Sequence, residues 1–226
     1  MLNDMNGKMN SSIIVAAGSG SRLASETPKQ FLKLKDVEIL AYSVQSFLKH
    51  PEINEVIIVT SANYLDHVIH QYPDCKVVVG GETRQDSVFN GLQACSPDTD
   101  MVLIHDAARP LIPSRVIDNC LSSLETYDGV APAIMPVDSM VQLEDSGFRN
   151  LRRDTLRIIQ TPQCFHMAIL KAAHASGKID TDEMGLVKQS NPHACLGFVE
   201  GAPETMKVTR SIDLEIIEIY LDAAEK

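Results

Sequence analysis

Five short, continuously apolar runs recur along the chain and form its clearest pattern. They cover residues 12–17, 55–60, 75–79, 101–105 and 129–135. Runs of this length with so few polar positions are typical of strands that are buried on both faces, as in a parallel sheet. Each run therefore predicts a strand of one central sheet.

The segments between these runs contain apolar residues at helical spacing. This spacing is found in residues 39–48, in residues 116–124 and in the C-terminal residues 214–221. His50-Pro51 predicts the end of the first helix, and Ser114 is the predicted N-cap of the second. Strands that alternate with helices of about 10–15 residues indicate parallel βαβ units, and hence a three-layer α/β sandwich.

Residues 137–160 interrupt this alternation. Two polar, strand-like runs, 137–143 and 148–159, flank an Asp-Ser-Gly turn, which predicts a hairpin. Its alternation of apolar and polar residues is poor and its arginines are dense. We expect an arm outside the central sheet that projects towards a partner subunit, with a solvated basic loop as the alternative.

Length and composition place the chain among single-domain globular proteins. It has 226 residues, 44% hydrophobic and 22% charged, so we expect a flexible lead at 1–11 and one domain at 12–226.

Lys and Arg number 20 against 30 Asp and Glu, a formal net charge of −10, which opposes non-specific binding to nucleic acid or an anionic membrane. No apolar run reaches the roughly 20 residues that span a bilayer. A polyanionic ligand must therefore meet a local group of basic residues.

The cysteines and the amino terminus bear on the cellular compartment. The five cysteines form no CxxC pair and have no zinc-ligand spacing. The first ten residues lack the apolar stretch and the basic start of a secretory signal. We therefore expect reduced thiols and a cytoplasmic location.

A glycine-rich run follows the first predicted strand, where open α/β sheets bind their ligands. Residues 16–22 read Ala-Ala-Gly-Ser-Gly-Ser-Arg, and residues 28–30 read Pro-Lys-Gln. The glycines let backbone N–H groups approach a triphosphate, and Arg22 and Lys29 supply positive charge. The run fits neither the dinucleotide fingerprint nor the Walker pattern. The alternative is a tight strand-to-helix turn with solvated basic residues.

The third predicted strand is followed by a second glycine pair. Residues 80–87 read Gly-Gly-Glu-Thr-Arg-Gln-Asp-Ser. Two glycines admit a flat base close to the backbone. Asp86 and Ser87 have the alternative explanation that they cap the start of a helix.

An acid and a base follow the fourth predicted strand, in residues 105–110, which read His-Asp-Ala-Ala-Arg-Pro. Asp106 could hold Mg²⁺ or ligand hydroxyls, and Arg109 could hold phosphate. The alternative is an internal ion pair between Asp106 and Arg109. Lys207 adds a further cation near the C-terminus.

Together these motifs resemble one family, the 2-C-methyl-D-erythritol 4-phosphate cytidylyltransferases of the non-mevalonate isoprenoid pathway. The likeness runs from about Ser12 to Leu221. It rests on residues 16–22, 28–30, 80–87, 105–110, 161–163, 181–183 and 207–209. The resemblance implies a Rossmann-like nucleotidyltransferase fold, a homodimer whose arm completes the neighbouring site, CTP and a polyol phosphate as substrates, and Mg²⁺.

The resemblance also implies a role for individual residues. The CTP phosphates would be bound by Ala16, Ala17, Gly18, Ser19, Gly20, Arg22 and Lys29. Cytosine would be read by Gly81, Glu82 and Ser87. Asp106 and Ala107 would hold the ribose and the groups of the nucleotide that face the metal. Asp106 is the one metal ligand implied, with Mg²⁺ held mostly by the CTP phosphates.

The acceptor, 2-C-methyl-D-erythritol 4-phosphate, would lie against Arg109 and Thr161 of one subunit. Ser139 and Arg153 would reach it from the arm of the partner. Lys207 would face the α-phosphate of CTP, and with Arg22, Lys29 and Mg²⁺ it would stabilise the charge of the reaction.

The chain departs from the family at two places, and two other functions remain open. Ser139 stands where the family more often has Thr, in a run one residue shorter, and Gly185 replaces a more usual Ser. A ribitol 5-phosphate cytidylyltransferase is the nearest alternative, although Ala16-Ala17, Asp86-Ser87 and Ala108 favour methylerythritol. A non-catalytic nucleotide-binding protein is the other, against which the complete group of basic residues argues.

Overall fold

The computed structural model describes residues 7–18 and 27–224. The predicted site residues Ser19, Gly20 and Arg22 lie outside these ranges. The first strand, β1 (Met9–Ala16), begins three residues before the predicted start at Ser12. The predicted lead of residues 1–11 was therefore too long, because Met9 and Asn10 already pair with the neighbouring strand β6 (Thr99–Asp106).

All five apolar runs form strands of one central sheet, as predicted. Besides β1 and β6 they give β4 (Glu55–Thr60), β5 (Lys76–Val79) and β7 (Gly129–Ile134). The described part of the sheet has eight strands in the order β10-β7-β11-β6-β1-β4-β5, with β12 also paired to β7. The pairs β1–β4, β1–β6, β4–β5 and β7–β12 are parallel. The prediction of a mostly parallel α/β sheet is thus confirmed.

Three strands were not predicted as members of this sheet. They are β10 (Ile158–Ile159), β11 (Gln163–His166) and β12 (Leu196–Glu200). Strand β11 lies between β6 and β7 and runs antiparallel to both. Strand β10 pairs with the end of β7, so the segment 137–160 was wrongly placed wholly outside the sheet. Its last apolar pair returns to the sheet, where Ile159 packs against the core.

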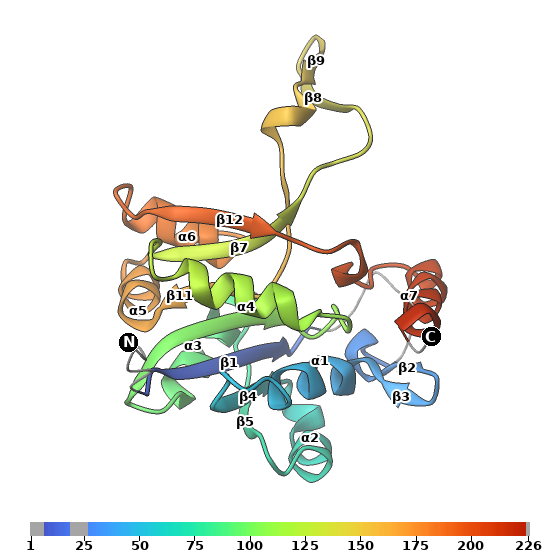
Figure 1. The fold of residues 1–226 in the computed structure, drawn as a ribbon, viewed down its shortest axis with the longest axis vertical. Helices are drawn as coiled ribbons and strands as arrows, with labels where there is room; N and C mark the ends of the chain where they lie inside the picture. The colour runs from blue at the N-terminus through green and yellow to red at the C-terminus, as the bar shows by residue number, and fades with distance from the viewer. Residues whose placement is uncertain (1–6, 19–26, 225–226) are drawn as a thin grey trace, which may run out of the picture.

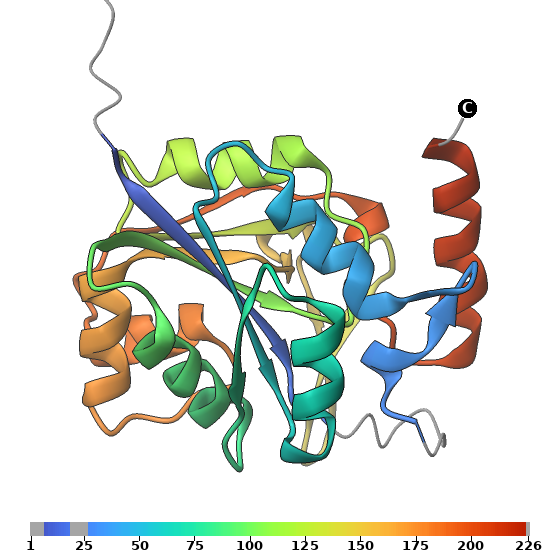
Figure 2. The ribbon, with the colours of Figure 1, turned by 90° about the horizontal axis from the view of Figure 1, so that it is seen from below.

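Helices cover both faces of the sheet, and Figure 2 shows the three layers. One face carries α1 (Ile39–Leu48), α2 (Leu65–Gln71) and α4 (Ser114–Ser123). The other carries α3 (Arg84–Ala94), α5 (Met167–Ala175) and α6 (Glu183–Ser190). Successive residues of a strand point to opposite faces, so Ile13 packs with the second group and Ile14 with the first. This two-sided burial explains why the strands have continuous apolar runs.

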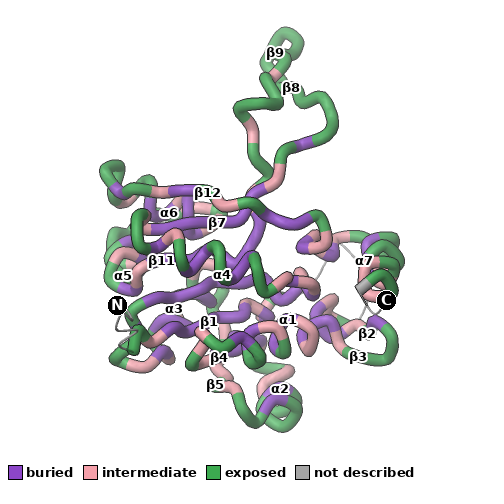
Figure 3. The backbone as a smooth tube through the Cα atoms, viewed as in Figure 1, coloured by how far each residue is buried: buried purple, intermediate pink, exposed green. Residues whose placement is uncertain are grey.

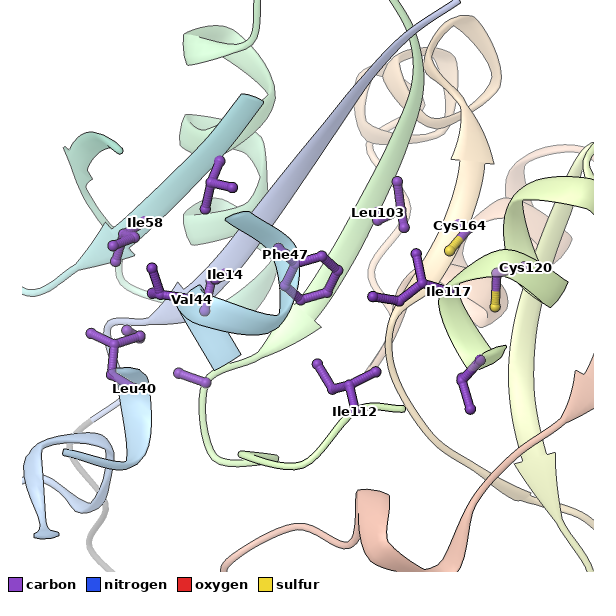
Figure 4. Packing of buried hydrophobic residues seen from close by; sticks show 14 of the residues in the cluster. Ile14, Leu40, Val44, Phe47, Ile58, Leu103, Ile112, Ile117, Cys120 and Cys164 are labelled. Carbon is purple, nitrogen blue, oxygen red and sulfur yellow. The ribbon is translucent and has the colours of Figure 1, made fainter. Parts of the chain in front are cut away.

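The core beneath α1 and α4 is shown in Figure 4. Val44 and Phe47 of α1 and Ile117 of α4 are at most 1% exposed, and they pack with Ile14 and Leu103 of the sheet. The prediction of both helices is confirmed, with one correction. Helix α4 begins at Ser114 itself, and its N-cap position is occupied by the preceding proline, so no side chain caps this helix.

A smaller apolar cluster joins the C-terminal helix α7 (Ser211–Ala224) to the amino-terminal half. Ile217 of α7 and Val208 are buried with Leu34 and Ile39. Leu34 belongs to a two-stranded ribbon of β2 (Lys33–Leu34) and β3 (Val37–Glu38). This packing brings the segment before α7 close to the carboxyl edge of the sheet.

The predicted hairpin is present as β8 (Met140–Glu144) and β9 (Gly147–Leu151), joined at Asp145-Ser146. It projects from the body of the molecule (Figure 1), and nearly all of its residues are exposed (Figure 3). Exposed apolar side chains on it include Leu143, at 80%, and Phe148, at 64%. The hairpin therefore has no core of its own within one chain, as expected for an arm.

Over residues 7–18 and 27–224, no helix is both long and apolar enough to cross a membrane. The five cysteines are free thiols.

Candidate active site

The carboxyl ends of β1, β4, β5 and β6 lie level with one another. Val15 is in register with Asp106, and Thr60 is in register with both Ala16 and Val79. The loops that leave these strands are therefore adjacent, and this edge is where open α/β sheets bind ligands. Because β11 is antiparallel to β6, its amino end reaches the same edge, which places Thr161 there.

Asp106, the last residue of β6, lies at the centre of a cluster of cations. Its Oδ1 accepts a hydrogen bond from Arg84 Nε at 3.1 Å, and its Oδ2 accepts one from Lys207 Nζ at 2.6 Å. Arg109 Nε is 3.9 Å from the same Oδ2. Arg84 also donates from Nη1 to both oxygens of Glu183, at 2.9 and 2.8 Å. Three cations against two carboxylates leave the cluster with a net positive charge, as a phosphate ligand requires.

The charge state of Asp106 follows from these neighbours. Burial opposes ionisation of the Asp106 carboxyl, but Arg84, Lys207 and Arg109 together hold its pKa well below the usual range. The predicted Asp106–Arg109 pair is the weakest of the three contacts, because 3.9 Å is beyond hydrogen-bond distance. Asp106 is thus a permanent anion that orients cations belonging to three different parts of the chain.

The segment that carries Lys207 is fixed to the sheet edge by three hydrogen bonds. Arg109 Nη1 donates to the carbonyl of Thr205 at 2.8 Å, and the amide of Val208 donates to the carbonyl of Ala108 at 2.8 Å. Lys29 Nζ donates to the carbonyl of Val208 at 2.9 Å. The structure therefore brings together Lys29, Lys207 and the turn at the end of β6, residues 106–109, which we call the Asp106 turn. These parts lie far apart in the sequence.

The glycine-rich run after β1 is described as far as Gly18. The side chain of Gln30, which is 3% exposed, donates from Nε2 to the carbonyls of Ala16 and Gly18 at 2.6 and 3.0 Å. Both carbonyl oxygens are thereby turned towards the protein. An added Cβ on Gly18 would meet no atom of residues 7–18 and 27–224 within 4 Å. Ala16 is buried and Ala17 is half-buried at this edge.

The second glycine pair is explained by packing. An added Cβ on Gly80 would lie 2.5 Å from the Cβ of Ala17, and one on Gly81 would lie 2.3 Å from the Cβ of Asp86. The missing side chain of Gly80 therefore lets the turns after β1 and β5 approach each other, and that of Gly81 leaves room for Asp86. Ser87 Oγ, at the same turn, accepts from the amide of Gly81 at 3.1 Å.

The neighbouring acids of this turn differ in setting. Asp86 and the N-cap residue Thr83 form a capping box at the start of α3, so the capping explanation of Asp86 is confirmed. Glu82 is exposed beside it. The turn thus combines a fixed backbone, held by Asp86, with the exposed carboxylate of Glu82.

Thr161 is 4% exposed, and its hydroxyl is engaged within the protein. His105 Nε2 bonds to the carbonyl of Arg109 at 3.0 Å, and a carbonyl can only accept, so Nε2 carries the proton. His105 Nδ1 must then accept from Thr161 Oγ1 at 2.9 Å, while that oxygen accepts from the amide of Asp106 at 3.2 Å. Burial lowers the pKa of His105 to about 4, which keeps this neutral tautomer. In this arrangement the hydroxyl supports the Asp106 turn, whereas the resemblance implies substrate contact.

The remaining predicted residues divide into two groups. Ala107 is 1% exposed, and its amide donates to the carbonyl of Val15 at 3.2 Å, which joins the turns after β1 and β6. Ser139 and Arg153 lie in the arm, where Arg153 donates to the carbonyl of Val137. The hairpin of the arm projects from the body (Figure 1), and within the described residues neither Ser139 nor Arg153 forms a hydrogen bond or ion pair with the cluster around Asp106.

A divalent cation would find one protein ligand here. Over residues 7–18 and 27–224, no three His, Cys, Asp or Glu side chains are grouped to hold a metal ion. A carboxylate offers about four acceptor sites, and Arg84 and Lys207 use two of those on Asp106. Mg²⁺ commonly binds through one or two carboxylates, waters and substrate phosphates. The residues therefore fit a metal that arrives largely coordinated by a triphosphate.

Arg84, Glu183 and Gln30 are site residues that received no role from the sequence. All three stand inside the quoted motifs 80–87, 181–183 and 28–30. Their position inside these motifs was the sequence signal that could have identified them. The motifs do not reveal their partners, since Arg84 and Glu183 are 99 residues apart and Gln30 bonds to main-chain atoms.

The fold and this positively charged edge define an α/β protein of the nucleotidyltransferase class. Residues 11–223 match a family model described as 2-C-methyl-D-erythritol 4-phosphate cytidylyltransferase. The chain belongs to this family of enzymes. A relative of that name from Clostridium botulinum (strain ATCC 19397 / Type A) is 37% identical, over 94% of this chain and 97% of its own length. One from Bacillus cereus (strain ATCC 10987 / NRS 248) is 34% identical over 95% and 98%.

Solved structures agree with this assignment. The crystal structure of 4-diphosphocytidyl-2C-methyl-D-erythritol synthase from Anaerococcus prevotii superposes with a TM-score of 0.85 at 26% identity, covering 95% of this chain and 96% of the other. The 2-C-methyl-D-erythritol 4-phosphate cytidylyltransferase of Thermus thermophilus gives 0.78 at 26% identity, with 93% and 98% covered. The predicted family and fold class are confirmed.

Proposed function

We propose that the protein transfers the cytidylyl group of CTP to 2-C-methyl-D-erythritol 4-phosphate through the cluster around Asp106. The reaction gives 4-diphosphocytidyl-2-C-methyl-D-erythritol and pyrophosphate. The observation that carries the proposed site is the convergence of Arg84, Arg109 and Lys207 on one buried carboxylate at the ligand edge of the sheet. Family membership supplies the reaction.

The chemistry is a single in-line displacement. An oxygen of the acceptor phosphate forms a bond to the α-phosphorus of CTP, and the bond from that phosphorus to the bridging oxygen of the β-phosphate breaks. The electron pair leaves with pyrophosphate. A phosphate dianion is already a nucleophile, so catalysis rests on positioning and charge stabilisation. The neutral, fully engaged His105 agrees with a site that needs no general base.

Individual roles follow from charge and position. Lys207, held by Asp106, would stabilise the α-phosphate as its charge develops, and Lys29 would bind the outer phosphates together with Arg22. Ala16, Ala17 and Gly18, with Ser19 and Gly20, would offer backbone N–H groups to the phosphates. The carbonyls of Ala16 and Gly18 are already bonded to Gln30, which supports this assignment.

Recognition of the nucleoside would fall to the neighbouring turns. Gly81, Glu82 and Ser87 would contact cytosine, because they lie on the turn that packs against Ala17. Asp106 and Ala107 would lie near the ribose. If Mg²⁺ is bound, Asp106 would hold it together with the CTP phosphates, and the ion would neutralise part of the triphosphate charge.

The acceptor would be bound across two subunits of a homodimer. Arg109 would contribute from one chain, with Thr161 supporting the Asp106 turn, and Ser139 and Arg153 would come from the arm of the other. Two observations support this: the arm has exposed apolar residues and no core of its own, and its hairpin projects from the body of the molecule (Figure 1). Closed two-fold symmetry would make the exchange reciprocal. We place the enzyme in the cytoplasm, where its five free thiols would stay reduced.

Phosphorus NMR of the reaction mixture tests the proposed reaction. Purified protein with CTP, Mg²⁺ and 2-C-methyl-D-erythritol 4-phosphate should give one new diphosphate ester and one pyrophosphate for each CTP consumed. CMP in place of the ester would mean that water is the acceptor. No consumption of CTP would indicate a non-catalytic nucleotide-binding protein.

A further inference from the structure

Glu183 is an anion in an apolar setting. It is the first residue of α6 and is 1% exposed, and the next residues of that helix, Met184, Leu186 and Val187, pack in the core. Burial raises the pKa of its carboxyl, and Arg84 opposes this rise. Both oxygens accept from one nitrogen of Arg84, an arrangement that favours the ionised form. A buried charge of this kind is retained only with a fixed partner.

The two backbones that carry Glu183 and Arg84 are rigidly placed. Gln163 of β11 accepts from the amide of Met184 at 3.0 Å and donates to the carboxylate of Asp182 at 3.2 Å, which fixes the start of α6 to the sheet. Arg84 is the first residue of α3, whose start is fixed by a capping box. The guanidinium therefore spans two stationary carboxylates, those of Glu183 and Asp106.

The way in which Arg84 shares its nitrogens between Glu183 and Asp106 has a consequence for Lys207. Glu183 holds Nη1 of Arg84, and Arg84 meets Asp106 through Nε and through oxygen Oδ1 alone. Oδ2 is left for Lys207 at 2.6 Å. An arginine without a second anion tends to bind a carboxylate through both oxygens. Without Glu183, the guanidinium would be free to turn so that its Nε–Nη2 edge binds both oxygens of Asp106, and Arg84 would then compete with Lys207 for Oδ2.

We propose that Glu183 is a positioning residue, which restrains Arg84 so that Asp106 keeps one oxygen for Lys207. The proposal rests on the function proposed above, in which Lys207 faces the α-phosphate. Glu183 itself does not touch the substrates. It determines where the ammonium group of Lys207 lies before CTP binds.

The test uses Glu183→Gln and a matched control, Glu200→Gln, which removes the same charge from an exposed position of β12. The first readout is the nitrogen NMR signal of the Lys207 ammonium group in full-length protein labelled at lysine, assigned by its loss in Lys207→Arg. We expect this signal to shift in Glu183→Gln and to stay in place in Glu200→Gln. This measurement needs no turnover, so it separates failure of this proposal from failure of the proposed function.

The second readout is kinetic. In folded Glu183→Gln, kcat should fall by about 10-fold to 100-fold while the KM of each substrate stays within about threefold, because the lost interaction acts in the transition state. Glu183→Asp, which keeps the charge, should recover part of the loss. If Glu183→Gln does not fold, Arg84→Lys replaces it, because a single ammonium cannot span both carboxylates. An unmoved Lys207 signal, or an unchanged kcat, in a folded variant would overturn the proposal.

Discussion

The hydroxyl of Thr161 offers a direct test of how the Asp106 turn is held. Thr161→Val replaces the hydroxyl by a methyl group of similar size and leaves the backbone unchanged. Two buried groups then lose their partner: Nδ1 of His105, at 2.9 Å, and the amide of Asp106, at 3.2 Å. Thr161 is 4% exposed and His105 is 0% exposed, so water does not readily replace the lost bonds.

The magnitude follows from these two unpaired groups. Each buried donor or acceptor left without a partner costs about 1–3 kcal/mol, so the free energy of unfolding should fall by about 2–6 kcal/mol. In a domain of this size, 1 kcal/mol corresponds to a change of about 2–4 °C in Tm, so Tm should fall by about 4–24 °C. Thr161→Ser keeps the hydroxyl and loses one methyl group, for which we expect about 1 kcal/mol.

Urea unfolding and thermal unfolding followed by circular dichroism give both values, and steady-state kinetics completes the assay. The structure predicts that Thr161→Val is the less stable variant by at least about 1 kcal/mol, and that its kcat falls because Asp106 is no longer held. Equal stability of the Val and Ser variants, together with a raised KM for the polyol phosphate alone, would refute this reasoning. It would show that the hydroxyl serves the substrate, as the resemblance implies.

Three further predictions concern the proposed site. Lys29→Ala should lower kcat by roughly 10²–10³ in a folded protein, whereas the exposed Lys33→Ala should not, and near wild-type kcat in Lys29→Ala would contradict a phosphate role. CTP should exceed ATP, GTP and, by a smaller ratio, UTP in kcat/KM; efficient use of ATP would exclude a site shaped for a pyrimidine. Mixed dimers of Lys29→Ala and Arg153→Ala subunits should regain activity, since one of their two sites has neither lesion; no recovery in proven mixed dimers would place Arg153 outside the partner's site.

Much of the fold could be predicted because burial on both sides leaves a direct trace in the sequence. The runs that became β1, β4, β5, β6 and β7 contain almost no polar positions, and each is followed by the loop that forms the ligand edge. The hairpin was predictable for the opposite reason, since its residues have no buried face. Both patterns depend only on local sequence.

The strands that escaped prediction depend on contacts made elsewhere in the chain. Strand β11 has four residues, including Gln163 and His166, and gives no continuous apolar run. Its place between β6 and β7 is set by pairing on both edges, as with Phe165, which faces Val102 and Gly129. Gly129 has no side chain there because an added Cβ would lie 2.3 Å from the ring of Phe165. Such fits appear only in three dimensions.

The site shows the same limit. Asp106 and Arg109 could be selected because charged residues that follow buried strands are unusual, and Lys207 received its role from the family resemblance. Their geometry could not be predicted, since the strong contacts of Asp106 are with Arg84 and Lys207 at 3.1 and 2.6 Å, and Arg109 is more distant. Gly185 is a similar case: an added Cβ would meet the carboxylate of Asp180 at 2.5 Å, so a serine there would require Asp180 to move.

The acceptor is the central element of this account, and internal competition tests it most directly. Purified protein is given CTP, Mg²⁺ and equal amounts of 2-C-methyl-D-erythritol 4-phosphate and ribitol 5-phosphate, and the two nucleotide products are measured by mass spectrometry at low conversion. Their ratio equals the ratio of kcat/KM for the two acceptors. The account predicts that the methylerythritol product predominates by at least about 100-fold, as expected for a site that binds the hydroxyls of one polyol. A predominant ribitol product would contradict it.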